Sequence, residues 1–122
     1  MNVEIWMSKD IRAASPAQPI RDAARTMKEI EAGFLPVAEN DRLIGMVTDH
    51  DITVRAVSEG KGPDTPVRDV MSEEVLYCFE DDDFCGVSSR MSELQVRQLP
   101  VLDRERRLVG IILTPGHLTG RQ

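Results

Sequence analysis

The stretch FLPVAENDRLIGMVT at residues 34–48 decides the fold, because the chain contains a second version of it. Residues 98–113 read QLPVLDRERRLVGIIL, so the Leu-Pro-Val at 35–37 returns at 99–101, an offset of 64 residues. Each copy has two short apolar runs separated by a polar turn, which is the pattern of two consecutive strands. We therefore expect one such strand pair in each half of the chain: Phe34–Ala38 with Leu43–Val47, and Gln98–Leu102 with Leu108–Leu113.

The repetition extends outward from these strands to nearly the whole chain. Val3–Ser8 aligns with Val67–Ser72 at the same offset, which grows to 66 where Thr48 aligns with Thr114. Matches in constant order, with single-residue slips at turns, indicate an internal duplication. A Gly- and Pro-rich connector at 59–64 separates the copies. The sequence thus predicts repeat one at 1–60 and repeat two at 61–122.

Each repeat also contains an amphipathic helix ahead of its strand pair. Apolar residues recur there at helical spacing, with charged residues between them in repeat one; these are Ile20, Ala23, Ala24, Met27 and Ile30, then Phe84, Val87, Met91 and Leu94. A short helix ending at 7–8 or 71–72 and a short strand at 11–13 or 75–78 come first. A final helix begins near Thr48, and a shorter one near Thr114. The expected fold is α+β, with β-α-β-β-α in each repeat, and the two small units pack together.

Composition narrows the classes of protein to which the chain can belong. Its 122 residues are 41% hydrophobic and 30% charged, which is typical of one globular domain. A net charge of −6 argues against nucleic acid or an anionic membrane as the main partner. No apolar run approaches the roughly 20 residues of a membrane helix, and the first residues lack a signal-peptide pattern. With two cysteines only, we expect a reducing cytoplasm.

Taken together, the order, spacing and duplication of these segments resemble a tandem pair of CBS domains, the module named after cystathionine beta-synthase. The residues that carry the resemblance are the opening segment 67–72, the two Leu-Pro-Val strands, and the stretches 45–52 and 95–101. The resemblance implies two repeats with pseudo-two-fold symmetry, a Bateman module. Such pairs usually form homodimers and signal to a separate protein partner. Many bind AMP, ADP, ATP or S-adenosylmethionine in the cleft between repeats.

The resemblance covers nearly the whole chain and leaves no room for a catalytic domain. The sequence also contains no phosphate-binding Gly-rich loop ending in Lys, no His-Glu-x-x-His and no Gly-x-Ser-x-Gly. We therefore expect a regulatory protein that is not an enzyme. It should require no cofactor, and an adenine nucleotide or S-adenosylmethionine would act as a regulatory ligand.

Thr48 and Asp51 are the sharpest candidates for ligand binding. In the family pattern, Gly and two apolar residues precede a Ser or Thr, and an Asp follows three positions later; Gly45 to Asp51 fits it. The resemblance implies that the Asp accepts hydrogen bonds from both ribose hydroxyls, a strong charge-assisted contact. The same spacing is also typical of a capping box at the start of a helix. Both interpretations can hold at once.

Further ligand contacts follow from the resemblance alone. The purine would lie against apolar side chains and backbone, and the phosphate would meet cationic groups. The candidates for the base and cleft wall are Met46, Val47, Leu76, Tyr77 and Val96, and those for the phosphate are His50, Arg55 and Arg97. Each has a plainer alternative, since the first five could simply pack in the core and exposed arginines are usually solvated.

Repeat two departs from the ligand-binding pattern. One residue is inserted after Gly110, and His117 stands where repeat one has Asp51. A neutral histidine cannot offer two acceptor oxygens to a diol. We expect at most one well-formed nucleoside site per chain, around Asp51. This degeneracy also keeps open an alternative function, a ligand-free dimerisation or interaction module with an empty cleft.

Two other kinds of site have weaker support in the sequence. Cys78 and Cys85 do not have the spacing of a zinc site, and although a redox-sensitive disulfide is conceivable, we expect buried free thiols. Asp49, His50 and Asp51 carry metal-ligating groups, but a chain with two histidines offers few ligand combinations. We expect no metal site.

Overall fold

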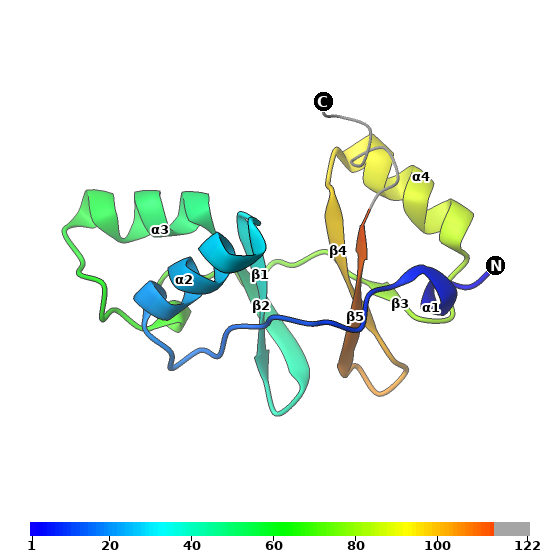
Figure 1. Ribbon diagram of the computed structural model, residues 1–122, viewed down its shortest axis with the longest axis horizontal. Coiled ribbons are helices and arrows are strands. Elements are labelled where there is room, and N and C mark those ends of the chain that lie inside the picture. Colours follow the sequence, from blue (N-terminus) through cyan, green and yellow to red (C-terminus); the bar gives the residue numbers. More distant parts are fainter. Residues whose placement is uncertain (114–122) are drawn as a thin grey trace. The chain divides into compact units, whose positions relative to one another are not determined.

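The computed structural model describes residues 1–113 of the chain (Figure 1). It contains helices and strands in alternation, which confirms the α+β class. The helices are α1 (Val3–Trp6), α2 (Ile20–Ile30), α3 (Asp49–Arg55) and α4 (Phe84–Leu94), with 3₁₀ turns η1 (Val57–Glu59) and η2 (Val67–Asp69). The strands are β1 (Phe34–Glu39), β2 (Arg42–Thr48), β3 (Cys78–Phe79), β4 (Gln98–Leu102) and β5 (Leu108–Leu113). None of these helices is both long enough and apolar enough to cross a membrane.

The chain folds into two compact units whose limits differ from those of the sequence repeats. One unit is 12–75, and the other joins 1–11 to the described residues from Leu76 to Leu113. Each repeat therefore contributes its opening segment to the unit that holds the strands of the other repeat. The boundaries 1–60 and 61–122 stay a prediction of where the two sequence repeats lie. They do not show that the opening segments are exchanged between the two units.

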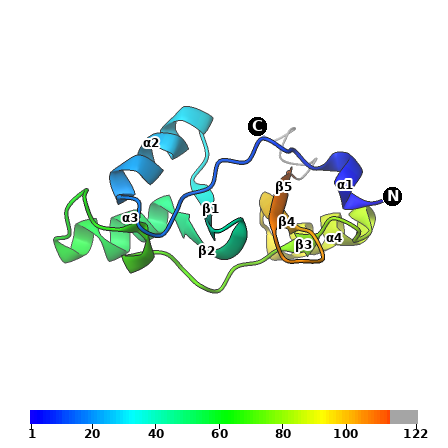
Figure 2. The same ribbon diagram turned by 90° about the horizontal axis from the view of Figure 1, so that it is seen from below.

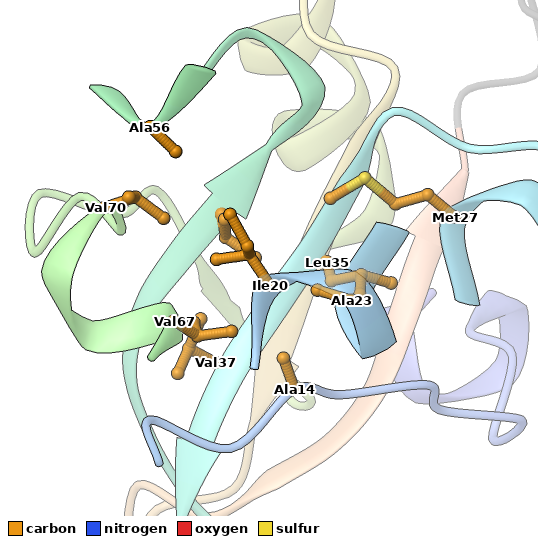
Figure 3. Packing of buried hydrophobic residues seen from close by; sticks show 10 residues of the cluster. Ala14, Ile20, Ala23, Met27, Leu35, Val37, Ala56, Val67 and Val70 are labelled. Carbon is orange, nitrogen blue, oxygen red and sulfur yellow. The ribbon is translucent and has the colours of Figure 1, made fainter. Parts of the chain in front are cut away.

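Unit 12–75 is built on the antiparallel pair β1–β2. The strands pair Leu35 with Val47, and Ala14 adds a single parallel bridge to Val37. The strand expected at 11–13 is therefore reduced to one bridge. Both views place α2 and α3 on the same side of this pair (Figures 1 and 2). They cover a core that also takes side chains from η2 (Figure 3), formed by Ala14, Ile20, Ala23, Met27, Leu35, Val37, Val47, Ala56, Val67 and Val70.

The other unit has a three-stranded sheet in the order β3-β4-β5. β3 runs parallel to β4, and β4 runs antiparallel to β5. Helices α1 and α4 contact each other, and the ring of Trp6 stacks on that of Phe84 at 5.0 Å between centroids. The core beneath them consists of Val3, Cys78, Val87, Met91, Leu99, Val101 and Ile112.

The same backbone contacts hold the opening segment in both units. Ser72 N–H donates to Met46 O at 2.8 Å and receives the return bond at 2.9 Å, and Ser8 pairs in the same way with Ile111. The backbones come so close only because a glycine precedes each paired strand residue. A Cβ on Gly45 would lie 2.5 Å from Ser72 O, and one on Gly110 would lie 2.9 Å from Ser8 O.

Most expected elements are found where the sequence places them. The strand pairs and both amphipathic helices agree within one or two residues, and a helix follows Thr48. Not all the apolar residues at helical spacing are buried: Ala24, Ile30 and Leu94 are exposed. The helix expected near Thr114 lies outside the described residues.

Candidate functional site

The start of α3 carries the strongest sequence motif, and its local geometry is complete. Strand β2 ends at Thr48, whose side-chain oxygen accepts a hydrogen bond from Asp51 N–H at 3.0 Å. Asp51 Oδ2 in turn accepts from Thr48 N–H at 3.0 Å. These reciprocal bonds form a capping box, which satisfies amide groups that the first turn of a helix leaves without intrahelical partners. The capping interpretation of this motif is confirmed.

Asp51 nevertheless retains acceptor capacity beyond the cap. The residue is only 8% exposed, which is unusual for a carboxylate. Its second oxygen, Oδ1, faces Arg55 Nε at 3.9 Å, longer than a hydrogen bond. A carboxylate oxygen has two lone pairs. Within residues 1–113, Asp51 Oδ1 therefore has acceptor capacity that the helix cap does not use.

Arg55 also contacts the backbone that follows η2. Its Nη1 donates to the backbone carbonyl of Met71 at 3.2 Å and lies 3.5 Å from that of Val70. Asp51 and Arg55 stand four residues apart, so they share one face of α3. From the sequence, Arg55 was expected to contact a phosphate or to be a solvated surface residue, and neither expectation includes these carbonyls. The repeat alignment, which pairs Met71 and Ser72 with Met7 and Ser8, was the available signal.

The two strand residues before Thr48 have different surroundings. Val47 has no exposed surface and belongs to the hydrophobic core, so the structure favours the packing interpretation for it. Met46 is half-buried, and its backbone is bridged to Ser72. Since successive strand side chains point to opposite faces, Met46 lies on the face opposite to Val47.

Asp49 and His50, the first two residues of α3, are exposed. His50 N–H donates to Asp49 Oδ1 at 2.8 Å, and the His50 side chain is open to solvent. Within residues 1–113, no three or more His, Cys, Asp or Glu side chains gather closely enough to hold a metal ion.

The remaining candidates belong to the other unit. Leu76 is 48% exposed, Arg97 is exposed, and Val96 packs partly against the core of that unit. The Tyr77 ring meets Phe79 edge-on at 5.6 Å, and its hydroxyl accepts from Arg106 Nη2 at 2.9 Å. Thr48, Asp51, Met46, Val47, His50 and Arg55 thus belong to one unit, and Leu76, Tyr77, Val96 and Arg97 to the other. The ligand-binding roles of all ten stay predictions. His117 lies outside the described residues.

The cysteines differ from each other. Both are free; Cys78 is buried and Cys85 is exposed. Burial, and to a smaller extent the negative charge of Asp82, raise the pKa of the Cys78 thiol to about 11. The expectation of buried free thiols is right for Cys78 and wrong for Cys85.

Comparison with protein families and curated proteins agrees with the duplicated architecture. The family model described as the CBS domain matches residues 3–57 and again 67–113. The CBS domain-containing protein YhcV of Bacillus subtilis is 37% identical over 111 residues, which cover 91% of this chain and 79% of YhcV.

Solved structures of similar fold include two with bound groups. Hypoxic Response Protein I, with two coordinated zinc ions, is 29% identical with a TM-score of 0.78, and the match covers 93% of each chain. The CBS domain pair of protein MJ0100 was solved in complex with 5′-methylthioadenosine and S-adenosyl-L-methionine. It is 27% identical with a TM-score of 0.79, and the match covers 98% of this chain and 96% of that one.

Proposed function

The chain belongs to the CBS domain family, and from this premise we propose that it senses an adenosine-containing ligand through Thr48 and Asp51. Paired CBS domains are regulatory modules. The finer proposal is that AMP, ADP, ATP, S-adenosylmethionine or a related nucleoside binds at the start of α3. Its ribose hydroxyls would donate to the Asp51 carboxylate.

The observation that carries the proposal is the state of Asp51. Its carboxylate is held in place by the cap through Oδ2, while Oδ1 has, among residues 1–113, a 3.9 Å contact with Arg55 Nε. A fixed acceptor that need not reorganise on binding loses little free energy in forming new hydrogen bonds. The adenosyl ligands in the MJ0100 structure support the ligand class. The zinc ions of Hypoxic Response Protein I do not lead us to propose a metal here, given the absence of a suitable cluster within residues 1–113.

Signalling would follow from differential binding. A ligand shifts a protein between two arrangements only when it binds one of them better. We propose that the protein acts as a homodimer whose arrangement is read by a separate protein partner. Solution mass with and without ligand, measured by light scattering, tests the dimer independently of the ligand.

The ligand class is tested by thermal unfolding with adenosine, AMP, ADP, ATP, S-adenosylmethionine and GMP. A ligand at 100 times its Kd stabilises the folded state by about 2.7 kcal/mol, which raises Tm by at least about 5 °C in a domain of this size. A rise with one or more adenosyl ligands and none with GMP supports the proposal. No rise with any of them contradicts it.

The role of Asp51 is tested with Asp51→Asn and a 2′-deoxy ligand. An asparagine keeps an acceptor for Thr48 N–H, so the helix cap survives while the charge is lost. We expect wild-type protein to bind AMP about tenfold to a hundredfold more tightly than Asp51→Asn does. Removing the 2′-hydroxyl should weaken binding to wild type and have little further effect on the variant. Asp49→Asn, which removes the same charge from the exposed neighbouring residue, is the matched control.

One observation favours the second candidate function, a ligand-free interaction module. The capping box gives Thr48 and Asp51 a complete structural role without any ligand. A dimer whose Tm responds to no nucleotide would favour this function. Equal affinities of Asp51→Asn and wild type would remove the ribose assignment.

A further inference from the structure

Arg55 connects the proposed ribose acceptor to a distant backbone segment. Its guanidinium has Nε 3.9 Å from Asp51 Oδ1 and Nη1 3.2 Å from the carbonyl of Met71. The segment it reaches is fixed on both sides. Val70 is fully buried in the core, and Ser72 is bridged to Met46 on β2. Arg55 therefore joins α3 to residues 70–72, which lead out of unit 12–75.

The same contacts leave Arg55 poorly placed to bind a phosphate through two N–H groups. Arginine binds phosphate most strongly with two adjacent N–H groups in a fork. Here one arm of the fork donates to backbone carbonyls and Nε faces the carboxylate. A two-pronged phosphate contact through Nη1 would compete with these carbonyls, and one through Nε would bring the phosphate next to the negatively charged Asp51 carboxylate.

We propose that Arg55 is a positioning residue for the nucleoside site: it orients the Asp51 carboxylate and anchors residues 70–72, and it does not bind the ligand's phosphate. This inference rests on the proposed function, because it assigns Arg55 a role toward the ribose acceptor.

The test compares Arg55→Gln with wild type in two measurements. The first is the Kd for adenosine and for AMP, two ligands that differ only by the phosphate. The second is amide hydrogen exchange at Ser72, whose N–H donates to Met46 O at 2.8 Å. Arg25→Gln, which removes an exposed arginine from α2 in the same unit, controls for net charge and for loss of a surface arginine.

We expect Arg55→Gln to weaken adenosine and AMP by the same factor, about threefold to tenfold, as befits a residue acting through another. Ser72 exchange should be faster in Arg55→Gln and unchanged in Arg25→Gln. A loss confined to AMP would show a direct phosphate contact and overturn the inference. Unchanged affinities for both ligands, or unchanged Ser72 exchange, would also overturn it. Failure of wild type to bind any adenosyl ligand is a different result, which defeats the proposed function and this inference with it.

Discussion

Surroundings set the chemistry of individual side chains, and the two cysteines show this most directly. Cys78 lies in the core of its unit, where desolvation disfavours the thiolate and raises the pKa to about 11. Cys85 stands seven residues later on the exposed side of α4. The sequence could not separate them, because burial depends on which face of the folded element each residue occupies.

We predict that one thiol per chain reacts readily in the native protein at neutral pH. Only the thiolate is nucleophilic, so Cys78 should stay unmodified until the protein unfolds, and Cys85 should account for the reaction. Titration with a chromogenic disulfide should give one equivalent in buffer and two in denaturant. Cys85→Ser should abolish the native reaction. A rapid native reaction in that variant would contradict the assignment.

Asp103 gives a prediction about pH. The N–H groups of Arg107 and Glu105 and the Arg107 guanidinium donate to its carboxylate, and they lower its pKa below the ordinary 3.8. A carboxyl with a lowered folded pKa stabilises the protein above its unfolded value, and the benefit disappears as pH falls through the folded pKa. As the pH is lowered below 3.8, Tm should therefore fall less steeply in Asp103→Asn than in wild type. Equal slopes would show that this contact does not contribute.

At the scale of elements, local sequence patterns predicted structure well. Helix α2 and strands β4 and β5 follow apolar spacing that can be read within one segment, and the Thr48–Asp51 spacing predicted its cap. The strand expected at 11–13 failed because one bridge from Ala14 to Val37 is decided by distant packing. The Arg55 contact with Met71 was missed for the same reason, since it joins residues 16 apart in the sequence.

The cap of α3 should have a measurable effect on stability. Thr48→Ala removes the oxygen that accepts from Asp51 N–H at 3.0 Å, and loss of such a cap costs about 1 kcal/mol. Urea unfolding should show this decrease in the free energy of unfolding. Thr48→Ser keeps the hydroxyl and should stay close to wild type. A serine variant as unstable as the alanine variant would mean that packing of the threonine methyl, rather than the cap, stabilises the helix.

At the scale of the whole molecule, the duplication was readable in the sequence but the exchange of opening segments was not. Repeats are detected by similarity along the chain, whereas the exchange depends on Ser72 pairing with Met46 and Ser8 with Ile111. Only the glycines at 45 and 110 hinted at a close backbone approach, and glycine has several other uses. The boundaries of the sequence repeats therefore do not give the boundaries of the folded units.

The exchange predicts which fragment of the chain folds. Residues 12–75 contain the complete core of one unit, whereas 1–60 lacks Val67 and Val70, which are fully buried. Burying a valine contributes about 1.5–3 kcal/mol, a large share of the stability of a small unit. Fragment 12–75 should show cooperative urea unfolding by circular dichroism, and 1–60 should not. Cooperative unfolding of 1–60 alone would show that the opening segment is dispensable.

The exchanged segments also bear on how such a chain could arise. The strands of each repeat pair with an opening segment. In this structure that opening segment comes from the other repeat. Before duplication, a protein with one such repeat would have exchanged opening segments with a second molecule, as in a domain-swapped dimer. Joining two copies in one gene makes the exchange of opening segments intramolecular. Pairing of each opening segment with its strands then no longer depends on protein concentration.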